Sequence, residues 1–452
     1  MPVLKKKSKQ IQPARLMLLG FSAIILLGTI LLCMPFSSTD GKFGSFLDCL
    51  FTATSATCVT GITVFDTYRH FTYFGQGVIL MLIQVGGLGF LTFVTFFNLM
   101  LGKKLGWSVV KIAASDFTDS ALASTKRLFY EIVLYSFALE LGGALILMFV
   151  FVPQFGGYGV FMSIFMAISA FCNAGFDVLT ITDGAVGVSN YTDNPVVIIT
   201  LMLLIIIGGL GFIVWQNIRH YKATKRLLLH TKVVLVTTAV LIFGGGLFFF
   251  LAEFNNPETL GDMPVWEKIT TSLFMSVSSR TAGFPCFDLH GLNPVSKMFM
   301  TGLMFIGAAP ASTGGGIKVT TIAIIIATVI SVLKGNKDTQ IMGHRLKTDA
   351  ILKTIAVTVL SFALVVLSFS VITFCSEDLS LQDTIFEVVS AFSTTGYSMG
   401  ISEGMNVISK LIMILTMLAG RVGPVTLMLS LIIRTSKSSN NKILPEGDIL
   451  VG

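Results

Sequence analysis

The sequence predicts an all-α polytopic membrane protein of four fused repeats, each with a membrane span, a re-entrant pore loop and a second span. Three observations predict this fold. Apolar residues make up 53% of the 452 residues and charged residues only 12%, about half the charged share of an ordinary soluble domain. Long charge-poor runs recur along the chain, and one glycine turn recurs four times. We therefore expect eight transmembrane helices and four short pore helices around a pseudo-fourfold axis.

Eight runs are long enough to cross a bilayer, since a hydrocarbon core about 30 Å thick needs roughly 20 helical residues. Five of them carry no charge and cover residues 16–39, 71–102, 194–218, 233–252 and 354–376. Three carry one charged residue each: 132–152 with Glu140, 298–333 with Lys318, and 411–433 with Arg421. The sequence lacks the alternating ~10-residue segments of a β-barrel. Its composition also excludes a soluble enzyme, a disordered chain and a nucleic-acid-binding domain.

The charged residues sort by side of the membrane. Of the 31 Lys and Arg residues, 23 lie in the two termini and in three connections on one side of the spans. The positive-inside rule then predicts a multi-pass protein of the cell membrane, of a bacterial plasma membrane in our interpretation, with both termini in the cytoplasm. The basic loops either dock a regulatory partner or only satisfy topology and anionic membrane lipid. No nucleic acid partner is expected. Sixteen of the 24 acids lie in the outer connections, which indicates either an acidic vestibule that concentrates cations or simple depletion from the inner loops.

A glycine turn ends a short apolar segment in each of the four outer connections. The turns are SATCVTGI at 55–62, SAFCNAGF at 169–176, VSSRTAGF at 277–284 and SAFSTTGY at 390–397. Their glycines are 114, 108 and 113 residues apart. This interval predicts four repeats: 1–110 with the N-terminus, 111–225, 226–340 with an intramembrane gating loop, and 341–452 with the C-terminal tail.

The four turns are candidates for an ion filter. A helix too short to span cannot leave its terminal carbonyls facing lipid, so it is buried in protein or lines water. Four such helices would point their negative dipole ends at one place, and rings of carbonyls in the turns would replace the hydration shell of a monovalent cation. One turn alone would be explained as a helix C-cap, but four at matching positions favour the filter. The candidate ion-binding residues are Val59, Thr60, Gly61, Asn173, Ala174, Gly175, Thr281, Ala282, Gly283, Thr394, Thr395 and Gly396.

The second span of the third repeat is interrupted by Gly307-Ala-Ala-Pro310 and three successive glycines. These residues break helical hydrogen bonding, and irregular backbone inside a membrane must line a cavity. We therefore expect a flexible gating loop below the filter, with a static water-lining kink as the alternative. A charge inside a span is costly and usually functional, so Arg421 either forms a cation barrier or ties helices together. The candidate gate residues are Ser312, Thr313, Gly314, Gly315, Gly316, Lys318 and Arg421.

Three further features support structural roles. Glu140 is expected to bond one helix to another. Arg280 is expected to brace the filter through pore-helix carbonyls or an acid such as Asp177 or Glu387. The glycine pairs at 86–87 and 208–209 are expected to allow close packing of helices. The cysteines lack metal-ligand spacing, and a Cys286–Cys375 disulfide stays open. No metal site beyond potassium and no enzymatic activity is expected.

The motifs carry a resemblance to a known family. They are TCVTGI at 57–62, NAGFD at 173–177, RTAGF at 280–284, TTGY at 394–397, ASTGGGIK at 311–318, AGRVGP at 419–424 and LPEGDILVG at 444–452. Over essentially its full length the chain resembles the Trk/Ktr/HKT superfamily of potassium transporters. The first span begins near residue 16 and leaves no room for the N-terminal hairpin of Trk-type relatives, which favours a Ktr-type membrane subunit.

The resemblance implies a function and partners that the composition does not. It implies potassium translocation by a homodimer with one pore per subunit, often stimulated by sodium. It also implies a cytosolic regulatory ring of the RCK type, which would supply nucleotide binding from outside this chain. In plant relatives a serine at the first filter glycine goes with sodium selectivity, so Gly61 favours potassium. The alternative class is a sodium- or proton-coupled carrier with alternating access, although the parallel repeats favour it less than inverted ones would.

Overall fold

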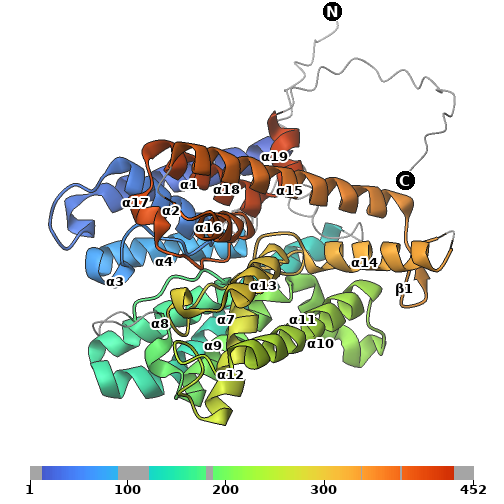
Figure 1. The fold of residues 1–452 in the computed structure, drawn as a ribbon, viewed down its shortest axis with the longest axis horizontal. Coiled ribbons are helices and arrows are strands. Elements are labelled where there is room, and N and C mark those ends of the chain that lie inside the picture. Colours follow the sequence, from blue (N-terminus) through green and yellow to red (C-terminus); the bar gives the residue numbers. More distant parts are fainter. Residues whose placement is uncertain (1–12, 90–121, 180–186, 337, 377–378, 432–452) are drawn as a thin grey trace, which may run out of the picture.

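The computed structural model describes residues 13–89, 122–179, 187–336, 338–376 and 379–431. Most of this part of the chain is helical (Figure 1). Its β structure is one small hairpin, in which β1 (Gln340–Ile341) pairs antiparallel with β2 (His344–Arg345). The polytopic helical fold is confirmed.

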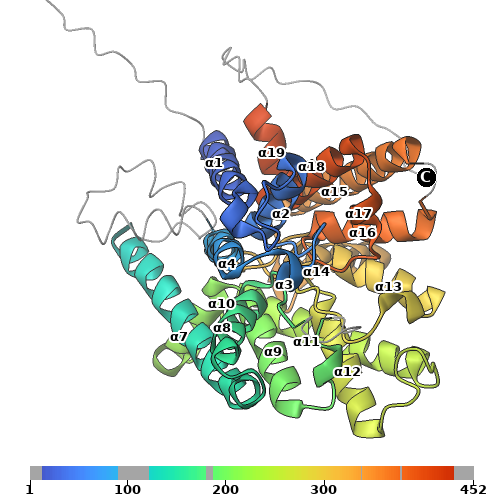
Figure 2. The same ribbon diagram turned by 90° about the vertical axis from the view of Figure 1, so that its left-hand side faces the viewer.

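The described helices are divided here into four groups, one for each predicted repeat. The first contains α1 (Pro13–Cys33), η1 (Pro35–Ser37), α2 (Phe46–Cys58), α3 (Thr67–His70) and α4 (Tyr73–Leu88). The second contains α7 (Leu122–Phe155), α8 (Gly157–Cys172), η2 (Ser189–Tyr191), α9 (Pro195–Gly209) and α10 (Phe212–Thr224). The third contains α11 (Leu229–Glu253), α12 (Val265–Ser278), η3 (Leu289–Gly291), α13 (Pro294–Phe305) and α14 (Val319–Leu333). The fourth contains α15 (Thr348–Cys375), α16 (Leu381–Ser393), α17 (Ile401–Gly404), α18 (Val407–Val422) and α19 (Pro424–Leu431). Figure 2 shows the four groups around a common centre in chain order.

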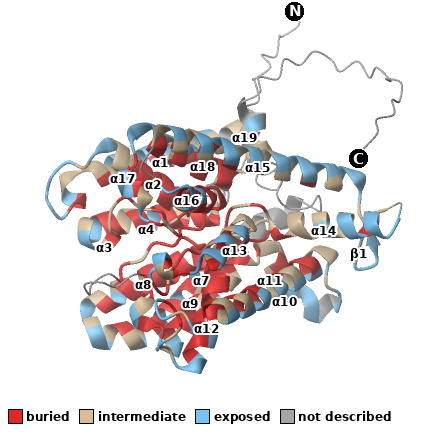
Figure 3. Ribbon diagram, viewed as in Figure 1, coloured by how far each residue is buried: buried red, intermediate tan, exposed pale blue. Residues whose placement is uncertain are grey.

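Burial follows the same plan. The short helices α2, α8, α12 and α16 lie innermost and are largely buried (Figure 3). The long helices α7, α11 and α15 carry exposed apolar side chains such as Phe149, Phe243 and Phe374. Such large apolar surface is unusual on a soluble protein, and lipid covers it in a membrane.

The structure modifies the predicted spans. Three helices of the described part are long and apolar enough to cross a membrane by themselves, namely α7, α11 and α15. In the second repeat α9 and α10 are bent by 94° instead of forming one helix over 194–218. The break in the third repeat was predicted, and it separates α13 from α14. Residues 90–102 of the predicted span 71–102 lie outside the described residues.

One glycine conformation causes the breaks that the sequence analysis did not predict. Gly89, Gly211 and Gly423 follow α4, α9 and α18 with φ of 82°, 88° and 92° and ψ of 132°, 143° and 135°. A positive φ is strained for residues with a Cβ atom and easy for glycine. The three positions share a pattern in the sequence, in which a glycine follows another glycine by three residues. The pairs are 86 and 89, 208 and 211, and 420 and 423.

Candidate functional site

The four buried short helices all end at the centre of the molecule. Three of them, α2, α8 and α16, stop at a residue in the left-handed conformation, which is Val59, Asn173 or Thr394 with φ between 51° and 59°. The next backbone N–H then donates to the carbonyl of a serine five residues earlier, as from Thr60 to Ser55 at 2.8 Å. Left-handed β-branched residues are uncommon and concentrate at functional sites.

A serine also fixes the backbone that leaves each turn. The Ser55 and Ser390 hydroxyls accept from the N–H groups of Gly61 (3.0 Å) and Gly396 (3.1 Å), and Ser169 donates to the Phe176 carbonyl. In the third repeat Ser278 accepts from the Phe284 N–H at 2.8 Å. Ser278 stands one position later than the other serines, because α12 ends without a left-handed cap and the irregular φ, 106°, falls at Thr281. This offset explains why the third turn lacked the shared Ser-Ala pair.

The four filter glycines meet in a closed ring. Each glycine lies against the carbonyl oxygen of the residue that precedes the glycine of the next repeat. The contacts are Gly61 with Ala174, Gly175 with Ala282, Gly283 with Thr395, and Gly396 with Thr60. A Cβ atom at Gly61 would be 2.5 Å from the Ala174 carbonyl oxygen, and one at Gly175 would be 2.8 Å from that of Ala282. A side chain at either position would therefore force the neighbouring backbone to shift. All four glycines also have φ between 69° and 103°. The structure thus brings the four predicted turns together, with four carbonyls at one level.

A cavity of about 260 Å³ opens on one side of this ring. The four glycines line it together with Asp66, Asp177 and Asp288. Each carboxylate accepts a backbone hydrogen bond two residues on, from Tyr68 N to Asp66, from Leu179 N to Asp177 and from His290 N to Asp288. These bonds hold three acidic groups in the lining of the cavity beside the ring.

The predicted gating loop lies directly against the other side of the turns. A Cβ atom at Gly314 would collide with the side chain of Thr281, and one at Gly315 with the side chain of Thr394. The Thr313 hydroxyl, which is buried, donates to the Phe171 carbonyl at the end of α8 at 3.1 Å. Lys318 folds back and donates to the Gly314 carbonyl at 2.7 Å. Glycine is therefore required in this loop for contact with the filter turns.

Arg421 joins the loop to the first repeat. Its guanidinium donates to the carbonyls of Thr313 and Gly86, and to that of Gly87 at 3.2 Å. Three carbonyl partners suit a planar guanidinium. Two of them, Gly86 and Gly87, lie in the last turn of α4, where a helix has fewer N–H partners for its carbonyls. Two roles were expected for Arg421, a cation barrier or a tie between helices. In the structure its hydrogen bonds tie α18 to α4 and to the predicted gating loop.

Close packing of the second spans is confirmed and extends to the fourth repeat. A Cβ atom at Gly86, Gly208 or Gly420 would collide with the carbonyl of the penultimate residue of the short helix in the same repeat. Those carbonyls belong to Thr57, Phe171 and Phe392. Arg421 stands at the position that Gly87 and Gly209 occupy in the first two repeats, a match that the spacing alone would have revealed.

Glu140, Arg280 and Glu387 each hydrogen-bond to another part of the chain. Gln84 donates to both carboxylate oxygens of Glu140 at 3.1 Å, which confirms a bond between α4 and α7. The expected partners of Arg280 were wrong, because its guanidinium donates to the Thr238 carbonyl of α11 at 3.5 Å. Glu387 instead accepts from Ser398 and from the Met399 N–H beyond the fourth turn.

Two contacts between turns were not predicted. The Tyr397 hydroxyl donates to the Phe284 carbonyl at 3.2 Å and so links the fourth turn to the third. The side chains of Asn173 and Thr281 are hydrogen-bonded at 3.0 Å and link the second to the third. All six cysteines are free, so the Cys286–Cys375 disulfide is not formed in this structure.

Comparisons with known proteins identify relatives of this chain. The TrkH family, described as cation transport proteins, matches residues 21–443. Ktr system potassium uptake protein B of Bacillus subtilis is 38% identical, with 97% of each chain covered. Potassium/sodium uptake protein NtpJ of Enterococcus hirae is 35% identical over the full length of both. The crystal structure of the potassium transporter TrkH from Vibrio parahaemolyticus matches with a TM-score of 0.72 at 17% identity, covering 95% of this chain and 86% of that one.

Proposed function

The chain belongs to the TrkH family of cation transport proteins, and we propose that it moves potassium ions across the cell membrane through the ring of four glycine turns. The closed ring of carbonyls from Thr60, Ala174, Ala282 and Thr395 is the observation that carries this proposal. An ion that sheds its water in such a ring gains carbonyl oxygens in return. The relatives named for potassium uptake support potassium as the cargo.

The surroundings of the ring favour a cation. Four helices end there, and the C-terminal end of a helix carries about half a negative charge. The three aspartates of the vestibule raise the local cation concentration. In this proposal the ions bind in succession to carbonyls of residues 59–61, 173–175, 281–283 and 394–396.

We assign the gate to the loop over 312–316 with Lys318 and Arg421. The contacts of Gly314 and Gly315 with the filter turns support a position for this loop across the route of an ion that leaves the ring. Arg421 holds it by the Thr313 carbonyl. A gate at this point closes when the loop is held and opens when the loop moves aside.

The assembly and its regulation are part of the proposal. The first relative is named as part of a Ktr system, which supports a membrane subunit that works as a homodimer with a cytosolic regulatory ring and binds nucleotide only through that ring. NtpJ is named for potassium and sodium, which supports sodium as a stimulating or second ion. Both termini would lie in the cytoplasm of a bacterial cell. A coupled carrier with alternating access is the competing function.

Uptake in a potassium-uptake-deficient cell tests the proposal. Wild type is expected to restore potassium uptake, and Gly61→Ser to shift the preference toward sodium, because a side chain there meets the Ala174 carbonyl. Gly302→Ala is the control, since a Cβ atom at Gly302 would meet nothing within 4 Å. Wild type that moves no potassium contradicts the function, and an unchanged ion preference in Gly61→Ser contradicts the filter. A requirement for a counter-ion gradient would favour the carrier.

A further inference from the structure

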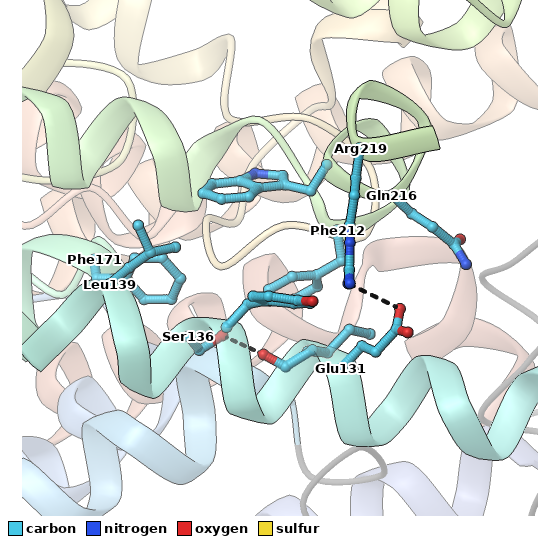
Figure 4. Close-up of a pocket in the computed structure, with 10 residues that line it drawn as sticks. Glu131, Ser136, Leu139, Phe171, Phe212, Gln216 and Arg219 are labelled. Atoms are coloured by element: carbon cyan, nitrogen blue, oxygen red, sulfur yellow. Dashed lines mark hydrogen bonds and ion pairs between the residues drawn. The ribbon is translucent and has the colours of Figure 1, made fainter. Parts of the chain in front are cut away.

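A small apolar pocket lies beside the gating loop, between α7, α10 and the end of α8 (Figure 4). Its volume is about 180 Å³, and the apolar lining comes from Ile132, Leu139, Phe171, Phe212 and Trp215. The proposed function leaves this pocket unused.

One end of the pocket holds an ion pair between Arg219 and Glu131. Arg219 reaches from α10 toward α7, where its guanidinium lies 4.7 Å from the centre of the Tyr135 ring and 3.7 Å from a carboxylate oxygen of Glu131 (Figure 4). The Arg219 side chain keeps 51% of its surface exposed, against 18% for Glu131. An ion pair this long and this exposed is weak, so the guanidinium can still bind a second anion.

The helix that carries Arg219 has the features of an interfacial helix. It leaves α9 at 94°, so it does not continue the direction of that span. Trp215 lines the pocket, whereas Lys222, Lys225 and Arg226 beyond it are exposed. Helices with one apolar face and one basic face lie along the membrane surface and attract anionic lipids.

We propose that this pocket binds one acyl chain of an anionic membrane lipid, with the lipid phosphate held by Arg219. The apolar lining matches the chain, and the Arg219 guanidinium matches the phosphate of the headgroup. A free phosphate would leave the apolar lining unfilled, and a phosphatidylcholine would bring its cationic choline group close to the Arg219 guanidinium. An anionic lipid fills the lining and carries no such cation.

The bound lipid would influence the gate through two hydrogen bonds. The Phe212 N–H donates to the carbonyl of Ala311 in the loop at 2.8 Å. The Phe171 carbonyl accepts from Thr313 in the same loop. Two residues that line the pocket therefore hold the loop, and this effect on flux, unlike the binding itself, rests on the proposed gate.

Binding is tested with the purified full-length protein in phosphatidylcholine nanodiscs, titrated with fluorescent phosphatidylglycerol. Saturable binding is expected for wild type. Arg219→Gln removes the charge and Leu139→Trp fills the pocket, and each should weaken binding at least about fivefold. Lys222→Gln, on the same helix but outside the pocket lining, should retain it.

The outcomes separate the possible occupants. Equal loss in Lys222→Gln means that general surface charge attracts the lipid, and that outcome overturns the site. So does unchanged binding in both pocket variants, or the absence of binding by wild type. Competition by inorganic phosphate without effect of Leu139→Trp identifies a phosphate site instead. Phosphatidylglycerol binding by a wild type that moves no potassium would contradict the proposed function and leave this inference standing.

Discussion

At the ring, the sequence predicts which positions need glycine, but it does not predict which other residues adopt the left-handed conformation. The glycines were predictable, because the same position recurs in four turns and both the positive φ and the approach of a carbonyl favour glycine there. The left-handed Val59 and Thr394 were not, since valine and threonine give no sign of a positive φ. Their conformation is imposed by the four turns packed together.

Tyr397 offers a test of how rigidly the turns are held. Tyr397→Phe removes the hydroxyl that donates to the Phe284 carbonyl. The Ser278 hydroxyl still donates to that carbonyl at 3.0 Å, so the variant loses one hydrogen bond worth about 0.5–1.5 kcal/mol. We expect a lower melting temperature and a higher ratio of sodium to potassium uptake, because the third turn is then less constrained. Tyr73→Phe is the control, since Tyr73 is 64% exposed. Equal ion ratios in the two variants would mean that this bond stabilises the fold alone.

At the scale of elements, the sequence showed where helices begin more clearly than where they break. Charge-free runs predicted the spans, but an apolar run continues across a break when glycine, not a polar residue, causes it. The break in the third repeat was predicted because proline and three glycines accompany it. The breaks at Gly211 and Gly423 each depend on a single glycine. They can be predicted only by comparing the sequences of the repeats with one another.

Gly420 tests the packing of the second spans on the short helices. Gly420→Ala forces a Cβ atom against the Phe392 carbonyl, and backbone at that carbonyl cannot move without disturbing the fourth turn. We expect a clear fall in melting temperature with loss of uptake. The matched variant Gly244→Ala, in α11, meets nothing within 4 Å and should be neutral or stabilising by about 0.4–1 kcal/mol. A melting temperature of Gly420→Ala equal to that of Gly244→Ala would contradict the close packing.

The gating loop and its arginine predict a common phenotype. Deletion of residues 313–316 removes the segment that contacts the filter turns, and Arg421→Ala removes the donor that holds it. We expect potassium flux in proteoliposomes to rise in both variants, each tenfold gain corresponding to about 1.4 kcal/mol of lowered barrier. Arg421→Lys keeps a positive charge but loses the planar guanidinium that reaches three carbonyls. Its flux should resemble that of Arg421→Ala if these hydrogen bonds hold the loop. It should resemble that of wild type if the charge alone forms a barrier. Unchanged flux in well-folded deletion protein would favour a static kink.

At the scale of the whole molecule, the fourfold arrangement was predictable and the cross-links within it were not. The regular interval indicated four similar units, and the structure brings their turns together in chain order. Contacts such as Gln84 with Glu140 or Arg421 with Thr313 join residues 56 and 108 positions apart. One sequence offers no periodic signal for such pairs, because each occurs once.

The vestibule shows the electrostatic consequence of that arrangement. Asp66 and Asp288 each come five residues after a filter glycine and line the cavity above the ring. Both accept a backbone N–H as helix N-caps, and asparagine serves equally well there. Asp→Asn at these positions therefore removes charge while it keeps the turn.

We expect the double variant Asp66→Asn with Asp288→Asn to raise the KM for potassium about threefold at low ionic strength, because a charged cleft concentrates its counter-ion. The maximal rate should change little, since the ring is intact. The difference from wild type should shrink as choline chloride is added to 0.3 M, because the Debye length falls below about 10 Å above 0.1 M salt. Asp262→Asn, an exposed acid of the third repeat outside the cavity lining, controls for net charge. A KM difference that persists at high salt would show that the two carboxylates bind the ion directly instead of attracting it from a distance.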